Sequence, residues 1–207
     1  MKKSQFLIYL CIVISLLNIF MILLYAQHRS TPADRQPLSA PSATACTTSS
    51  DIFIPASIDL AGETTPLHRL DVREALKKEL IVNTYLHSHT IQILKNAPRT
   101  FAIIEPILKA NGIPDDFKYL AVIESRLDPL IVSPAGAVGI WQIMKNTAKE
   151  LGLEVNQEID ERYNIEKSTE AAAAYLKKAY NRFGSWTLAA ASYNAGSAML
   201  SKQMNIQ

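Results

Sequence analysis

A carboxyl group at the end of an apolar helical stripe is the first candidate for chemistry in this sequence. Phe117, Leu120, Ala121 and Glu124 stand at positions i, i+3, i+4 and i+7, which share one face of an α-helix. Because Pro129 disfavours helical geometry at the residue before it, we expect Glu124 in the last helical turn. Desolvation and the negative end of the helix dipole would both raise its pKa, so the carboxyl could stay protonated and act as a general acid.

A structural role for Glu124 remains open at this point. The carboxylate could pair with Arg126 or a lysine, or it could be a solvated helix end. Isolated acids at helix ends are common, so the stripe alone does not establish catalysis.

A turn with two glycines follows the acid. In Ser133–Gly139, Gly136 and Gly139 allow the backbone to approach a ligand or to adopt unusual dihedral angles. Gln142 then offers an amide among apolar neighbours that include Met144. The structural alternative is a tight turn followed by core residues.

A second polar pair lies close to the end of the chain. The stretch SYNAG places the phenol of Tyr193 and the amide of Asn194 where a helix ends. The alternative is a tyrosine at the domain edge followed by Asn and Gly as ordinary helix-ending residues.

Helices must position these groups. Residues 71–95 have apolar residues at helical spacing and predict one or two helices. A further helix around Ile104 should stop at Asn111-Gly112, and Pro106 inside it predicts a kink or a later start. Asp115 and Asp116 could cap the helix that carries Glu124.

The remaining helices follow from capping and stop signals. Thr147 and Glu150 have capping-box spacing for a short helix. Residues 168–183 give the clearest helix, which Gly184 should end, and residues 186–193 should form the last one. Because no alternating run suggests a substantial sheet, we predict an all-α domain.

Composition excludes some classes of function. The chain has 207 residues, with 21 basic and 19 acidic side chains, so nothing indicates a nucleic-acid partner. Two cysteines, Cys11 and Cys46, are too few for a disulfide framework.

The N-terminal region predicts a membrane anchor. After Lys2 and Lys3 the chain is uncharged from Ser4 to Gln27, long enough to cross a hydrocarbon layer of about 30 Å. We favour an uncleaved anchor over a cleaved signal because the sequence before Gln27 fits a small-x-small cleavage site poorly. The lysines favour an N-terminus inside and an exported remainder.

The rest of the chain divides by composition. Residues 28–50 are rich in Ser, Thr, Pro and Ala and predict a flexible linker. We assign residues 51–110 to an N-terminal helical part and residues 111–207 to the domain that carries the candidate site.

Three ordered motifs resemble those of a known family. ESRLDPLIVSPAGAVGIWQIM, with GIPDDFKYLAVIES leading into it and SYNAG some fifty residues later, is similar to lytic transglycosylases with a lysozyme-like (SLT) domain. The membrane-bound D-type branch is the most similar, and DLAGE, PLHRLDV and FGSWTLAAASYNAG extend the resemblance over roughly residues 51–199.

This resemblance implies a reaction on peptidoglycan glycan strands. The β-1,4 bond between N-acetylmuramic acid (MurNAc) and N-acetylglucosamine (GlcNAc) would be cleaved without water, as the muramoyl 6-hydroxyl closes onto C1. Glu124 would first protonate the glycosidic oxygen and then accept the hydroxyl proton. The substrate's N-acetyl group would take the place of the second carboxylate used by many glycosidases.

The resemblance also implies roles for the other motif residues. Ser133 would hydrogen-bond near the N-acetyl or lactyl group, and Gln142 and Met144 would line the glycan cleft. Tyr193 and Asn194 would stand across from Glu124. A final pair would only shape the loop: Gly136 and Gly139. No metal or organic cofactor is implied, and His87 and His89 make a poor metal pair.

Two other functions stay open. A lysozyme-type muramidase would open the same bond with water, using a second carboxylate such as Asp128 or Asp160. A non-catalytic peptidoglycan-binding module would keep only the cleft. Relatives of the D-type branch continue with further helices after SYNAG, so we expect a C-terminally shortened domain in a sequence that ends at Gln207.

Overall fold

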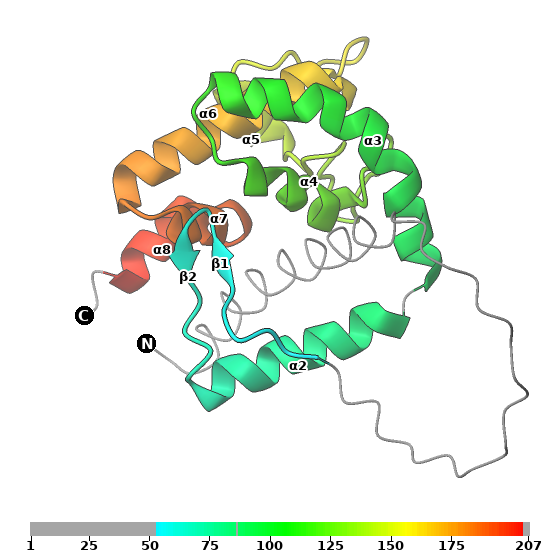
Figure 1. Cartoon of the computed structure of the whole chain (residues 1–207). Helices are drawn as coiled ribbons and strands as arrows, with labels where there is room; N and C mark the ends of the chain where they lie inside the picture. Colours follow the sequence, from blue (N-terminus) through cyan, green and yellow to red (C-terminus); the bar gives the residue numbers. More distant parts are fainter. Residues whose placement is uncertain (1–52, 86, 205–207) are drawn as a thin grey trace, which may run out of the picture.

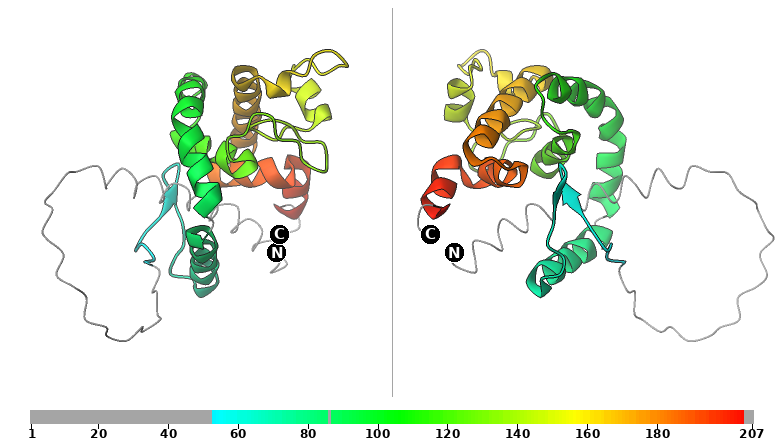
Figure 2. Two further views of the ribbon diagram at one scale, coloured as in Figure 1. Left: turned by 90° about the vertical axis from the view of Figure 1, so that its right-hand side faces the viewer. Right: turned by 60° about the vertical axis from the view of Figure 1, so that its left-hand side comes forward.

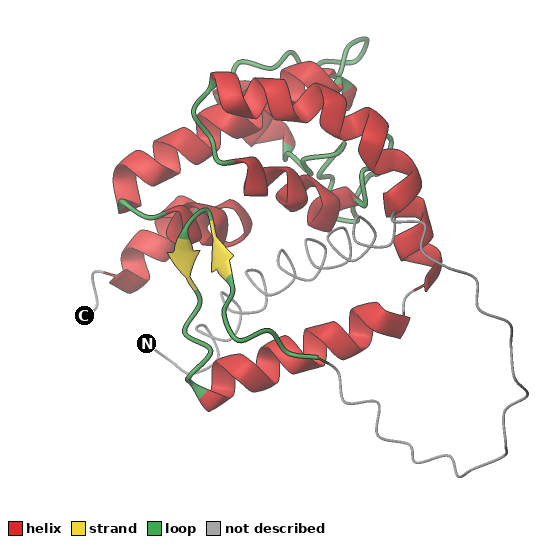
Figure 3. Cartoon of the chain, in the orientation of Figure 1, coloured by secondary structure: helices red, strands yellow, loops and turns green. Residues whose placement is uncertain are grey.

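The computed structural model describes residues 53–85 and 87–204. In this part the chain forms seven α-helices, two 3-10 helices and one two-stranded hairpin. The predictions of an anchor in residues 1–27 and a linker in residues 28–50 lie outside the described residues. The predicted all-helical class is confirmed apart from the small hairpin (Figure 3). The elements, in chain order, are β1 (Asp59–Leu60), β2 (Glu63–Thr64), α2 (Leu70–Tyr85), α3 (His87–Ala110), η1 (Asp115–Phe117), α4 (Lys118–Ser125), α5 (Lys145–Glu150), η2 (Glu161–Tyr163), α6 (Ile165–Phe183), α7 (Trp186–Ala195) and α8 (Ser197–Met204).

Helices α3, α4, α6 and α7 form the body of the molecule (Figure 1). Helix α6 packs mainly against α3 and α7. Helix α2 lies apart from this body, with the hairpin between them, in the views of both Figure 1 and Figure 2. The core gathers fully buried side chains from several elements, among them Leu120, Trp141 and Leu176.

The long helix α3 joins two predicted helices into one. It includes both Pro98 and Pro106, so of the two predicted alternatives, a kink or a later start, the later start is wrong. Each proline removes a backbone hydrogen bond, and Figure 1 shows α3 following a curved path. The predicted stop at Asn111-Gly112 is confirmed, because Gly112 has a φ of 67° and Ile113 N–H bonds back to the carbonyl of Leu108 at 2.9 Å.

Two capping predictions are wrong. The side chains of Asp115 and Asp116 do not cap a helix: Asp115 pairs with Lys118, and Asp116 accepts from the backbone of Ala61. Helix α5 begins at Lys145, two residues before Thr147, so the expected capping box does not form. Its end agrees with the prediction, because Gly152 follows with a φ of 83°.

In the last third of the chain, helices begin and end at typical capping residues. Asn164 caps α6, accepting from Lys167 N–H at 2.8 Å, and Gly184 ends it with a φ of 68°. Ser185 caps α7. Helix α8 follows α7, so the expectation that residues 186–193 form the last helix is wrong. Among the described residues, no helix is both long and apolar enough to cross a membrane.

The hairpin is small but sharply defined. Asp59 pairs with Thr64 and Leu60 with Glu63. Its two turn residues, Ala61 and Gly62, have φ values of 54° and 80°, as a turn between antiparallel strands requires.

Candidate active site

Glu124 lies in the last turn of α4, where the chain leaves helical geometry. Arg126 and Leu127 follow with φ values of 56° and 61°. The Glu124 side chain is partly buried, and burial raises the pKa of its carboxyl from 4.5 to about 7. The expected desolvation of this acid is therefore confirmed.

The alternative of a paired structural acid gains no support. Within residues 53–85 and 87–204, the Glu124 carboxyl has no ion pair or hydrogen bond to protein. Arg126, the suggested partner, places its Nη1 atom 3.4 Å from Nε2 of His89. Glu124 is thus desolvated with no neutralising cation from the described part of the chain, and its protonated form persists to neutral pH.

Ser125, directly after the acid, ties the end of α4 to the glycine loop (residues 131–143), a contact that the sequence did not predict. Its buried hydroxyl lies 2.9 Å from the carbonyls of both Ala121 and Ile140 and accepts from Leu127 N–H at 3.1 Å. A small hydroxyl residue directly after the acid was the only available signal.

Ser133 closes the base of the glycine loop. Its hydroxyl accepts from Ala137 N–H at 3.0 Å, and its own N–H donates to the Ala137 carbonyl at 2.9 Å. The Ser133 oxygen therefore already holds the loop, while its hydrogen can still be donated to a ligand.

Gly139 is required by a close backbone approach, whereas Gly136 is required only by its dihedral angle. Both have positive φ, 77° and 83°. A Cβ at Gly139 would lie 2.2 Å from the carbonyl oxygen of Arg162, whereas one at Gly136 would meet no atom of the described residues within 4 Å.

Arg162 holds this loop through hydrogen bonds, and the sequence did not predict this role. Its buried Nη1 donates to the carbonyls of Gly136 at 3.0 Å and Ile143 at 3.1 Å. Asp160 holds the guanidinium through two bonds, of 2.9 and 2.6 Å. A buried arginine far along the chain gives no local pattern by which sequence could connect it to the loop.

The amide nitrogen of Gln142 hydrogen-bonds to the backbone of the glycine loop. It has a φ of 47°, and its Nε2 donates to the carbonyls of Gly139 at 2.9 Å and Ile131 at 3.3 Å. Met144, two residues on, is exposed.

Tyr193 on α7 lies near Glu124. Its hydroxyl donates to the carbonyl of Trp141 at 2.7 Å, and its ring makes an edge contact with that of Tyr175 at 5.2 Å. Burial, then the charge of Glu124, and then Tyr175 raise the pKa of Tyr193 well above its ordinary value, so the phenol stays protonated. Asn194, the next residue, is exposed.

Trp141 links the loop to the core. It is fully buried, and its Nε1 donates to Thr169 Oγ1 on α6 at 2.8 Å. The loop is therefore bonded to α4 through Ser125, to α6 through Trp141 and to α7 through Tyr193.

The two suggested second carboxylates have structural partners. Asp160 pairs with Arg162, and the hydrogen bonds to Arg162 hold its pKa below the ordinary value. Asp128 is exposed and accepts from Leu130 N–H at 2.9 Å. In the part of the chain that the structure describes, no group of three His, Cys, Asp or Glu side chains could hold a metal ion.

Together these contacts define one desolvated acid near a protonated phenol, next to a glycine loop that is hydrogen-bonded to α4, α6 and α7. Such an acid can donate a proton at neutral pH and, once ionised, can take one back. Those are the two proton transfers needed to cleave a glycosidic bond and close a ring.

Comparison with known proteins agrees with this arrangement. The family model for the transglycosylase SLT domain matches residues 101–207. Membrane-bound lytic murein transglycosylase D of Escherichia coli (strain K12) is 34% identical over 132 residues, which cover 63% of this chain and 28% of that protein. Peptidoglycan transglycosylase gp16 of Escherichia phage T7 is 36% identical over 110 residues, 51% of this chain and 8% of the phage protein. Membrane-bound lytic murein transglycosylase F of Salmonella typhimurium (strain LT2) is 34% identical over 91 residues, 42% of this chain and 16% of that protein.

The chain belongs to the transglycosylase SLT domain family. The matched segment includes Glu124, the glycine loop, and Tyr193 and Asn194 on α7. The chain spans only 28% of the length of the Escherichia coli relative.

Proposed function

We propose that this protein is a peptidoglycan lytic transglycosylase that cleaves the β-1,4 MurNAc–GlcNAc bond and leaves 1,6-anhydro-MurNAc ends. The observation that carries the proposal is Glu124, whose burial raises its pKa to about 7 without an ion pair in the described structure. The family match and the printed names of the relatives, murein and peptidoglycan transglycosylases, support the choice of substrate.

The reaction needs one acid twice. Protonated Glu124 donates its proton to the glycosidic oxygen, the bond from that oxygen to C1 breaks, and the GlcNAc side leaves as an alcohol. The Glu124 carboxylate then accepts the proton of the muramoyl 6-hydroxyl, whose oxygen forms a new bond to C1. No water is consumed, and the enzyme returns with Glu124 protonated.

The surrounding residues take supporting roles in this proposal. Tyr193 and Asn194 orient the acid and the N-acetyl group, and Ser133 donates to the muramoyl unit. Gln142 and Met144 line the glycan cleft. Hydrogen bonds of Ser125, Arg162 and Gln142 hold the loop in place before substrate arrives, and such prior positioning lowers the entropic part of the barrier.

The test is the product released from purified sacculi. The unchanged chain should release anhydro-muropeptides, and Glu124→Gln should lower that release at least about a thousandfold, since the amide cannot donate the proton. Mass spectrometry of the products distinguishes the three candidate functions. Reducing ends would indicate a muramidase, and binding without soluble product would indicate a peptidoglycan-binding module.

We also propose that residues 1–27 anchor the protein in the inner membrane, with the catalytic domain in the cell envelope. The long uncharged segment and the membrane-bound relatives support this placement. A mature N-terminus near Gln27 in the exported protein would contradict a retained anchor.

A further inference from the structure

A carboxylate from the hairpin holds the start of the helix that carries Tyr193. Glu63, on β2, accepts from Ser185 Oγ at 2.7 Å, from Trp186 N–H at 2.5 Å and from Thr187 N–H at 3.0 Å. These donors lie more than 120 residues further along the chain, at the N-terminus of α7.

The negative charge of Glu63 is stabilised by the N–H and O–H groups at the N-terminus of α7. Partial burial acts to raise the pKa of Glu63, but hydrogen bonds from Thr187, Ser185 and Trp186 outweigh it and lower the pKa. Glu63 is therefore ionised at neutral pH and faces the positive end of the helix dipole. Since Ser185 Oγ accepts from Leu188 N–H at 3.2 Å, the first N–H groups of α7 are all bound by these two side chains.

The same hairpin is bonded to the helix that carries the acid. The N–H of Ala61, in the turn, donates to Asp116 Oδ2 at 2.7 Å. Asp116 belongs to η1, which leads directly into α4. The hairpin thus joins the beginnings of α4 and α7.

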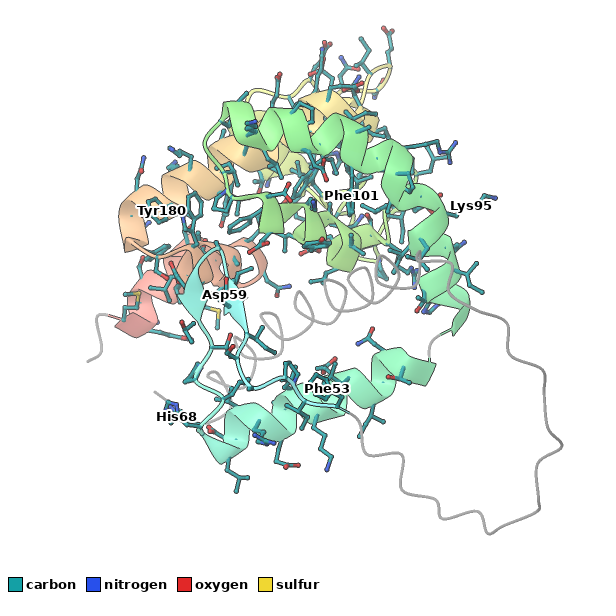
Figure 4. The ribbon with its side chains drawn as sticks, in the orientation of Figure 1. Phe53, Asp59, His68, Lys95, Phe101 and Tyr180 are labelled. Atoms are coloured by element: carbon teal, nitrogen blue, oxygen red, sulfur yellow. The ribbon has the colours of Figure 1, made fainter. Side chains whose placement is uncertain are left out.

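Those two beginnings also contact each other through aromatic rings. Phe117, the last residue of η1, meets Trp186, the first of α7, with ring centroids 5.3 Å apart. Trp186 in turn stacks on Tyr180 of α6 at 4.1 Å. Figure 4 shows the labelled Tyr180 near the end of α6, on the side of the molecule where the hairpin residue Asp59 lies.

The spacing along both helices is equal. Glu124 comes seven residues after Phe117, and Tyr193 comes seven residues after Trp186. Glu124 and Tyr193 therefore each lie about 10 Å along the chain axis from the Phe117–Trp186 contact. At that distance, a rotation of α7 by about 5° would move Tyr193 by about 1 Å, a misplacement that can cost about a hundredfold in rate.

We propose that the hairpin Asp59–Thr64 is a clamp that sets the separation of Glu124 and Tyr193, with Glu63 as its principal positioning residue. This inference rests on the proposed function. Glu63 lies outside the segment that matches the family model, residues 101–207. It acts through α7 and does not itself touch substrate.

The test combines Glu63→Gln with Tyr193→Phe in the full chain, using solubilised sacculi as substrate. Glu63→Gln should lower kcat roughly ten- to a hundredfold and change KM less than about threefold. In the Tyr193→Phe background the same change should cost less than about threefold, because the clamp acts through that tyrosine. Equal losses in the two backgrounds would overturn the proposal.

Glu166→Gln is the matched control. Glu166 is also a glutamate in the first turn of a helix, α6, but it is exposed and belongs to neither the clamp nor the site. Its rates should equal those of the unchanged chain. If Glu63→Gln behaves like this control, the clamp is refuted.

A measurement that needs no turnover separates this inference from the proposed activity. An NMR titration should place the pKa of the Glu124 carboxyl near 7 in the unchanged chain and lower in Glu63→Gln, as displaced α7 admits water. An unchanged titration would contradict the clamp even if no transglycosylase activity were found. Should Glu63→Gln fail to fold, Asp116→Ala loosens the opposite end of the clamp and must give the same lowered pKa.

Discussion

At the scale of single residues, the protonation state of Glu124 is the property on which the chemistry depends. The apolar stripe predicted both its helical face and its desolvation, because burial of one face follows from spacing alone. The position of Tyr193 next to the glycine loop could not be predicted from helical spacing. Its hydroxyl bonds to the backbone of Trp141, which lies 52 residues away in sequence.

The rate should follow this protonation state. With a pKa of about 7, about half of Glu124 can donate a proton at neutrality, and well above pH 7 that fraction falls about tenfold for each pH unit. We therefore expect kcat/KM on soluble glycan strands to be level below about pH 6 and to decline above about pH 7 with a slope of minus one. A rate that is constant to pH 9 would show that another group supplies the proton.

At the scale of elements, local signals predicted most helices, and contacts between distant segments explain the errors. Gly112 and Gly184 end helices as expected, since a positive φ is a property of the residue itself. Asp116, a reasonable cap from its position, instead accepts from Ala61 across 55 residues. The Asp160–Arg162 support of the glycine loop was missed for the same reason.

The two loop glycines should respond differently to the same substitution. Gly139→Ala adds a Cβ 2.2 Å from the Arg162 carbonyl to a strained φ, so we expect a loss of about 2–5 kcal/mol in the free energy of unfolding. Gly136→Ala, with a similar φ but open space, should lose only about 1–2 kcal/mol. Urea denaturation of both variants measures the difference, and equal losses would contradict the close packing of Gly139 on Arg162.

At the scale of the whole molecule, the buried acid makes stability depend on pH. The folded pKa of Glu124 is raised from 4.5 to about 7, so its contribution is complete below pH 4.5 and is lost as the pH rises through 7. The loss is at most about 3 kcal/mol, because the side chain is only partly buried.

Replacing the carboxyl should remove this dependence. We expect Glu124→Gln to gain stability relative to the unchanged chain between about pH 4 and pH 8, by up to about 3 kcal/mol. Denaturation curves at the two pH values give the comparison, with Glu166→Gln as the control for losing an exposed carboxylate. A constant gap between the Glu124→Gln and unchanged curves would mean that the acid is hydrated in the folded state.

The position of α3 in the sequence determines where shorter expression fragments of this protein can begin. The family match begins at residue 101, inside a helix that runs from His87 to Ala110. An expression fragment trimmed to that boundary would split a helix and discard the strand that carries Glu63. Fragments for crystallisation or inhibitor screening should therefore keep the hairpin Asp59–Thr64 together with the whole of α3.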